Sequence, residues 1–258
     1  MTMDWAQLYL FTLIFMRVTG FVLFNPILGR SSLPGLVRAG IVMVFSVFVL
    51  STVGQAPTPP GSVLEFGLHL VLELGVGFVL GFVMQLFFMV IQVGGEVIDA
   101  QMGLTMAQVY DSSSQVNMTV TASLLNVLMV LLFFTENGHY TMLRIFLASD
   151  QVVPFGEAAL GQAVASGVAE VFLSCMVLAI KLAFPILAAE LLGELGMGIL
   201  MKAIPQINAF VINIELKVII GLVLLFLFLS PISEFLLGVE ADMLEAMSQM
   251  LTIIAAPG

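Results

Sequence analysis

Two pairs of carboxylates are the residues whose types and spacing could support chemistry. Glu96 and Asp99 lie three positions apart, and Glu190 and Glu194 lie four positions apart. Residues at these spacings share one face of a helix, so each pair would place two negative charges side by side. Ionisable groups on apolar helices mark either an ion pathway or a polar contact between packed helices. A proton or ion relay and a purely structural contact therefore both remain open.

Other polar residues could complete these sites. The C-terminal half carries three candidates, Lys202, Gln206 and Lys217. We predict that these residues and the four carboxylates make inter-subunit or intramembrane polar contacts. His69 and Glu73, four positions apart, offer an alternative proton shuttle, although a hydrogen bond between helices is the more usual role for such a pair.

The sequence carries no recognisable catalytic constellation. His69 and His139 are the only histidines, and neither belongs to a zinc-binding spacing such as HExxH. A P-loop, a GxSxG elbow and a dinucleotide-binding glycine motif are all missing. Cys175 is the single cysteine, which excludes an internal disulfide and a thiolate metal cluster. We therefore expect a non-enzymatic protein without cofactor or metal.

Composition places these residues on apolar helices of a membrane protein. Of 258 residues, 60% are hydrophobic and only 9% are charged. A soluble domain carries charge on about a quarter of its residues, so lipid or other apolar protein must cover this chain. The net charge of -10 argues against nucleic acid as a partner, because phosphate contacts need an excess of Lys and Arg.

Six apolar blocks follow one another along the chain, and a membrane-spanning helix needs about 20 mostly apolar residues. The fold class predicted is an all-α polytopic membrane protein, as one integral membrane domain over residues 1–258. The third block is too long for one untilted crossing, and an acidic, amphipathic tail (239–254) follows the sixth. The blocks span residues 5–27, 37–53, 63–93, 120–134, 164–189 and 216–237.

Glycines at helical spacing predict close packing between helices. Gly77 and Gly81 form a small-xxx-small ridge, and Gly193 and Gly196 lie beside the second carboxylate pair. Small residues let two helix backbones approach closely, which suits an oligomer. A pore-lining role is the less favoured alternative.

A polar segment at 101–118 separates two apolar blocks. Met102, Met106 and Met118 flank or lie within it, and flexible thioethers can form an adaptable seal. Irregular backbone at membrane depth is tolerated only where protein buries it or where it lines a water-filled cavity. The segment is therefore either an exposed loop or a re-entrant segment that obstructs a path.

Two longer motifs follow one another along the chain: GGEVIDAQMGLTMAQVYD (94–111) and ELLGELGMGILMKAIPQINAFVINIELKVIIGL (190–222). In this order they resemble the FliR family of flagellar type III export-gate proteins. The likeness extends from end to end and, less closely, to virulence type III secretion counterparts. Family members often have Asp-Pro where this chain has Asp111-Ser112, which leaves the stiffness of that turn open.

The resemblance implies a subunit of a hetero-oligomeric gate built from kinked helical hairpins. FliP and FliQ are the implied partners in a stable complex, with FlhA and FlhB as neighbours and unfolded flagellar subunits as export substrates. The implied cellular location is the bacterial inner membrane within the flagellar basal body, with much of the gate on the extracytoplasmic side. A small ion-coupled transporter is the alternative, but no internal repeat supports it.

The resemblance also assigns a role to the polar segment. The stretch that matches residues 103–117 forms a plug inside the closed gate in this family. The residues implied in plugging or gating are Gly103, Met106, Tyr110, Asp111 and Met118. An apolar side chain such as Met106 would seal the path in one arrangement and move aside in another.

Overall fold

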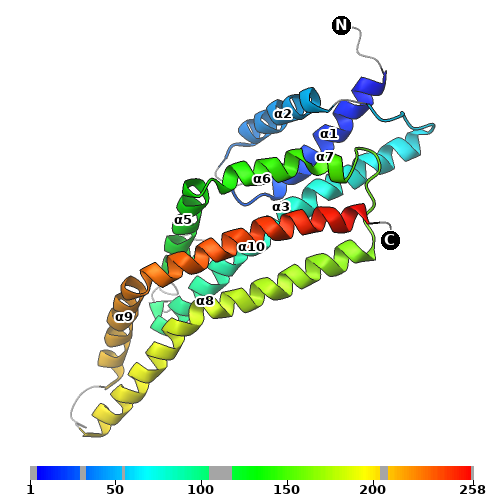
Figure 1. Ribbon diagram of the computed structural model, residues 1–258. Helices are drawn as coiled ribbons and strands as arrows, with labels where there is room; N and C mark the ends of the chain where they lie inside the picture. The colour runs from blue at the N-terminus through cyan, green and yellow to red at the C-terminus, as the bar shows by residue number, and fades with distance from the viewer. Residues whose placement is uncertain (1–4, 30–32, 54–55, 105–117, 204–208, 257–258) are drawn as a thin grey trace. The chain divides into compact units, whose positions relative to one another are not determined.

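The computed structural model describes residues 5–29, 33–53, 56–104, 118–203 and 209–256. Within these ranges the chain folds into helices and contains no strand, which confirms the all-α class. Figure 1 shows α1 (Trp5–Phe24), α2 (Gly35–Thr52), α3 (Val63–Met102), α5 (Val120–Thr135), α6 (Gly138–Leu147), α7 (Ser149–Val152), α8 (Gln162–Ala203), α9 (Ala209–Leu227) and α10 (Leu229–Ala255).

The described helices are long and apolar enough for a polytopic membrane protein. Four of them, α1, α2, α3 and α8, meet the length and hydropathy of a membrane span. Two further spans are possible if each bent pair counts as one: α5 with α6 and α7, bent by 70°, and α9 with α10, bent by 63°. Six, the upper end of this range, equals the number of predicted blocks.

Several helices extend beyond the apolar blocks. α3 continues to Met102 and α8 continues to Ala203, because polar residues such as Glu96 and Glu194 do not interrupt backbone hydrogen bonding. The predicted block over 216–237 is instead broken between α9 and α10, just before Pro231. Proline lacks an N–H and clashes with the carbonyl four residues earlier, so Pro231 is tolerated only in the first turn of a new helix.

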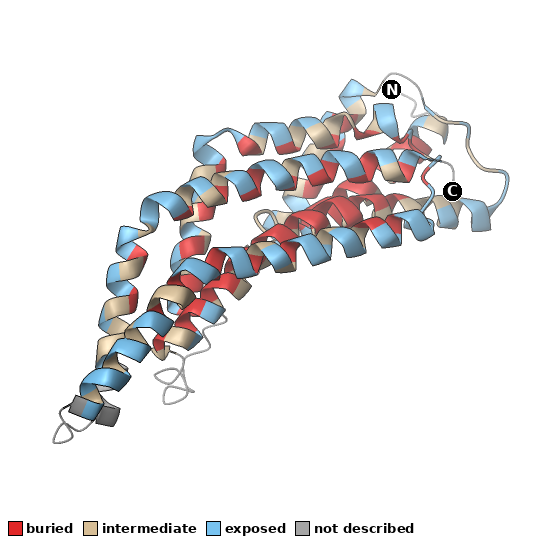
Figure 2. Ribbon diagram, turned by 60° about the horizontal axis from the view of Figure 1, so that its bottom comes forward, coloured by how far each residue is buried: buried red, intermediate tan, exposed pale blue. Residues whose placement is uncertain are grey.

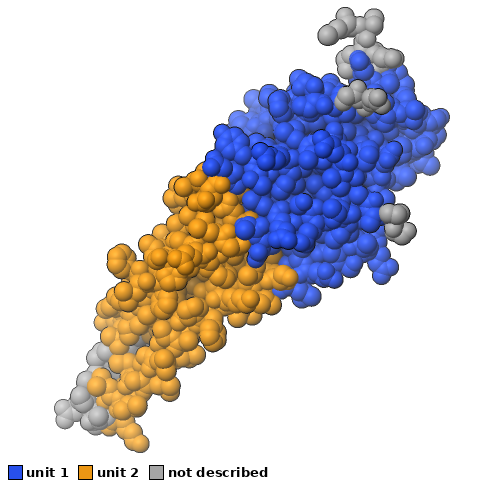
Figure 3. All heavy atoms as spheres, in the orientation of Figure 1, with its two compact units in different colours: residues 1–87, 137–173, 241–258 blue, residues 88–136, 174–240 orange. Residues whose placement is uncertain are grey.

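The chain divides into two compact units, coloured separately in Figure 3. Unit 1 contains residues 1–87, 137–173 and 241–258, and unit 2 contains residues 88–136 and 174–240. The core of unit 1 includes Leu13, Phe21, Val76, Leu80 and Met247, and that of unit 2 includes Ile98, Leu125, Met129, Leu182 and Leu236.

Burial differs greatly among the long helices. In α3, 67% of the apolar window is buried, whereas in α8 only 28% and in α2 only 17% is buried. Figure 2 shows exposed residues along the outer sides of the helices. The exposed side chains of α8 include Phe172, Leu173, Val177, Ile180 and Phe184. Such apolar faces need a cover of lipid or protein.

Candidate functional site

In unit 2, a carboxylate on α3 holds the first turn of α5. Asp99 is fully buried, and its Oδ2 accepts a hydrogen bond of 2.8 Å from the backbone N–H of Thr121. Its Oδ1 accepts a second bond from the Thr121 hydroxyl. The N-cap residue of α5, Thr119, makes no side-chain capping bond, so Asp99 supplies the negative cap from another helix.

A glycine lets the backbones of α3 and α5 touch beside this contact. A Cβ placed on Gly95 would lie 2.5 Å from the Cα of Ala122. Any larger residue at position 95 would separate the two helices. We refer to Gly95, Asp99, Thr121 and Ala122 as the clasp. The clasp joins the two chain segments that flank residues 103–119.

The predicted plug residues are only partly visible. Gly103 follows α3 with a φ of +79°, a left-handed conformation that favours glycine. Met118 is partly exposed, and its sulfur lies 3.5 Å from Nδ2 of Asn126. Met106, Tyr110 and Asp111 lie outside the described residues. The structure thus describes both ends of the segment and the clasp between them.

The second carboxylate pair lies in a cluster that also includes the end of α3. Glu194 forms an ion pair with Lys217 of α9. Nε2 of Gln101 lies 3.5 Å from Oε1 of the same carboxylate. The cluster of Gln101, Glu194 and Lys217 therefore ties α3, α8 and α9 together within unit 2.

Glu190 is the buried carboxylate of this pair. Its side chain is 1% exposed, and its Oε1 has no hydrogen-bond partner among the described residues. A buried polar atom without a partner costs free energy, so it needs an explanation. Thr119 and Glu240 of unit 2 likewise each have one buried side-chain oxygen without a hydrogen-bond partner among the described residues.

The remaining predicted polar residues have simpler surroundings. Glu96 does not share the bonds of Asp99, since its Oε1 accepts from Nε2 of Gln92 at 3.1 Å. Lys202 is exposed in the last turn of α8. Gln206 lies outside the described residues.

The four predicted packing glycines divide into two groups. A Cβ on Gly77 would overlap the carbonyl oxygen of Arg17, and one on Gly81 would lie 2.9 Å from that of Phe21, so α1 and α3 touch at both positions. By contrast, a Cβ on Gly193 would reach only Ile220, at 3.8 Å, and one on Gly196 would meet nothing within 4 Å.

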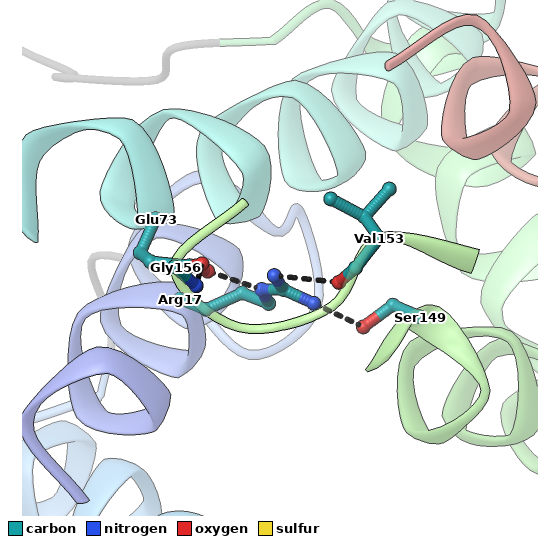
Figure 4. A network of polar contacts seen from close by, with 5 residues as sticks. All are labelled: Arg17, Glu73, Ser149, Val153 and Gly156. Atoms are coloured by element: carbon teal, nitrogen blue, oxygen red, sulfur yellow. Dashed lines mark hydrogen bonds and ion pairs between the residues drawn. The ribbon is translucent and has the colours of Figure 1, made fainter. Parts of the chain in front are cut away.

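Sequence reasoning missed the most extensive polar network, which lies in unit 1 (Figure 4). Arg17 and Glu73 are fully buried, and the Nε of Arg17 lies 2.5 Å from Oε2 of Glu73. The Arg17 guanidinium also donates to Oγ of Ser149 at 3.1 Å and to the carbonyl of Val153 at 3.0 Å. Glu73 accepts a further bond of 2.8 Å from the N–H of Gly156.

This network fixes residues 149–156 against α1 and α3. The guanidinium carbon of Arg17 lies 4.1 Å from the centroid of the Phe155 ring, which adds a cation–π contact. His69 does not pair with Glu73, because its Nδ1 lies 2.5 Å from the hydroxyl of Tyr9. The lone arginine within an apolar helix was the available signal, since such a charge requires a buried partner.

Within each unit, Asp99, Glu194 and Arg17 bind other described residues of that same unit. Within the described ranges, no group of three or more His, Cys, Asp or Glu side chains could hold a metal ion. The arrangement suits a scaffold that holds helices and the two ends of a loop at fixed positions.

The sequence matches one known family over most of its length. Residues 8–242 match the family described as bacterial export proteins, family 1. The chain is 30% identical to the flagellar biosynthetic protein FliR of Escherichia coli (strain K12) over 237 residues, which cover 90% of this chain and 88% of that protein. It is 26% identical to FliR of Bacillus subtilis (strain 168) over 255 residues, or 95% of both chains.

The similarity extends to a protein of another name. The surface presentation of antigens protein SpaR of Salmonella typhimurium is 28% identical over 220 residues, which cover 84% of this chain and 82% of that protein.

Proposed function

Because the chain belongs to the bacterial export proteins of family 1, and to the FliR group among them, we propose that it is a non-enzymatic subunit of the flagellar type III protein export gate. It is a multi-pass membrane protein and a component of flagellar export. In the proposed gate it assembles with FliP and FliQ, beside FlhA and FlhB, in the inner membrane within the basal body. Unfolded flagellar subunits pass through the assembly.

The clasp is the observation that supports a sealing function most directly. A segment that obstructs a channel must return to the same place after it has moved aside, which requires its two ends to be held at a fixed separation. Asp99 and Thr121 join the chain before and after residues 103–119 through two hydrogen bonds. We propose that the loop over 101–118 seals the closed gate and that the clasp holds its base.

Exposed apolar faces and a buried carboxylate oxygen without a partner support assembly into a hetero-oligomer. The apolar faces of α8 and α9 are exposed, Gly196 leaves open space, and the Glu190 Oε1 has no partner among the described residues. Partner helices would cover the apolar faces, and a donor from a partner would bind Glu190. The whole chain then acts as a single export-gate domain.

Deletion of residues 105–115 in the assembled gate tests the sealing function. The expected result is a membrane that leaks small ions while FliP and FliQ still co-purify with the shortened chain. The matched control is deletion of residues 56–60, which connect α2 to α3 in unit 1 and lie outside the proposed seal. An ion leak unchanged by the first deletion would exclude the plug.

Co-purification also separates the gate from the transporter alternative. A gate subunit should appear in a fixed complex with FliP and FliQ. A transporter would instead move an ion when reconstituted alone in liposomes, and that result would contradict the proposal.

A further inference from the structure

A cavity of about 300 Å³ opens between α1 and α2 in unit 1. Among the described residues that line it, Arg38 is the one charged residue, and most of the others are apolar. The Nε of Arg38 is enclosed and has no hydrogen-bond partner among the described residues. The residues that line the cavity are Phe15, Thr19, Leu23, Gly35, Arg38, Ala39 and Val42.

The start of α2 adds a second positive feature to the same cavity. The N-cap residue is Pro34, no side chain caps the helix, and the first turn contains no acidic residue. The free N–H groups of a helix N-terminus carry partial positive charge and attract anions. A Cβ on Gly35 would meet no atom of the described residues within 4 Å, so these residues leave space for a ligand at the first turn. A guanidinium and a helix N-terminus therefore converge where none of the described lining residues supplies an anion.

The exposed surface of α2 indicates where this anion comes from. Its large exposed side chains are apolar: Leu36, Val37, Met43, Val44, Val47 and Phe48. Its 18 residues span about 27 Å, close to the roughly 30 Å of a bilayer core. With α2 placed across a bilayer, Arg38 in its first turn would lie at one end of the helix, at the depth of the headgroups.

We propose that this cavity is a binding site for an anionic phospholipid. The phosphate accepts hydrogen bonds from the Arg38 guanidinium and lies at the N-terminus of α2. An acyl chain extends along the apolar face of α2. Basic pockets between membrane helices recognise anionic headgroups in this way, and Arg suits phosphate because its planar fork donates two parallel hydrogen bonds. The bound anion also completes the first turn of α2, which no side chain of this helix caps.

Native mass spectrometry of the detergent-purified full chain, incubated with phosphatidylglycerol or phosphatidylcholine, tests the proposal. The expected result is retention of phosphatidylglycerol but not phosphatidylcholine. Arg38→Gln should reduce the retained phosphatidylglycerol about five-fold. Arg144→Gln is the matched control, because Arg144 is an exposed arginine of the same unit outside the cavity, and it should change nothing.

A second variant separates loss of the site from loss of folding. Gly35→Leu keeps Arg38 but fills the opening, and it has room for the added side chain. It should reduce lipid retention as Arg38→Gln does, with unchanged helical circular dichroism. Arg38→Lys should restore part of the retention, since the charge remains without the fork.

Three results would overturn the proposal. Equal phosphatidylglycerol retention by the wild type and Arg38→Gln would show that the lipid binds elsewhere. Displacement of the lipid by an equal concentration of inorganic phosphate would identify the site as one for free anions. Loss of a partner subunit on Arg38→Gln, with unchanged lipid retention, would assign the cavity to a protein carboxylate instead.

Discussion

Asp99 on α3 takes the place that the N-cap side chain of α5 leaves empty. It accepts hydrogen bonds from both the backbone N–H and the hydroxyl of Thr121, 22 residues further along the chain. The carboxylate thereby caps one helix from another and sets the distance between the two ends of the intervening segment.

Variants of the clasp should lose stability in a fixed order. Asp99→Ala removes both bonds and leaves a buried N–H without an acceptor, so we expect a loss of about 1–3 kcal/mol in the free energy of unfolding. Thr121→Val removes only the hydroxyl bond and should cost about 1 kcal/mol. Circular dichroism during titration with dodecyl sulfate measures both. Equal losses for the two variants would contradict the capping function of Asp99.

Replacing one partner of the buried ion pair of unit 1 should lower the free energy of unfolding more than replacing both partners. Arg17→Met leaves Glu73 as an uncompensated buried charge, with an expected loss of about 3–5 kcal/mol. The double variant Arg17→Met, Glu73→Met removes both charges and should recover part of this loss. The same titration, arranged as a double-mutant cycle, measures the coupling. Additive losses would show that the two residues act independently.

Gly77 should tolerate no side chain, whereas Gly67 on the same helix should benefit from one. A Cβ at position 77 would overlap the Arg17 carbonyl oxygen, so Gly77→Ala must separate α1 from α3 at a cost of about 1–3 kcal/mol. A Cβ at position 67 meets nothing within 4 Å, and Gly67→Ala should stabilise the helix by about 0.5–1 kcal/mol. The opposite signs of the two thermal shifts are the result to check.

Substitution of the second carboxylate pair should affect assembly more than the fold of this chain. The Glu194–Lys217 ion pair is partly exposed, with side-chain exposures of 33% and 24%, so breaking it within the chain costs at most about 1 kcal/mol. We expect Glu190→Ala and Glu194→Ala to lose co-purification with FliP and FliQ. Glu170→Ala, which removes an exposed carboxylate of the same helix outside the predicted contacts, provides the comparison. Normal assembly with lost secretion of flagellar subunits would instead support a proton relay.

The helical class could be predicted from the sequence because composition excludes a charged, water-covered surface. The ends of the helices could not be predicted in this way, because hydropathy reflects how apolar a segment is and not where its backbone hydrogen bonding stops. α8 therefore continues through Glu190 and Glu194 to Ala203, well beyond the apolar block. The break before Pro231 had a local signal in the proline itself, which a hydropathy pattern does not register.

The contacts of the site were less predictable than its residues. Spacing places Glu96 and Asp99 on one helical turn, but it does not show that Gln92 binds one and Thr121 the other. The Arg17 network was missed because its members are far apart in sequence: Glu73 follows Arg17 by 56 residues, and Ser149 by 132. The local pattern indicates that Arg17 needs a buried partner, but it does not show which residues supply it.

That separation along the chain has a consequence for biosynthesis. At roughly 5–20 residues per second, the ribosome makes Glu73 several seconds after Arg17, and Ser149 later still. Throughout that interval the first helix carries a positive charge that its own neighbours cannot neutralise. α1 therefore cannot reach its final buried position when it is made. It must remain near water or headgroups until α3 has been synthesised.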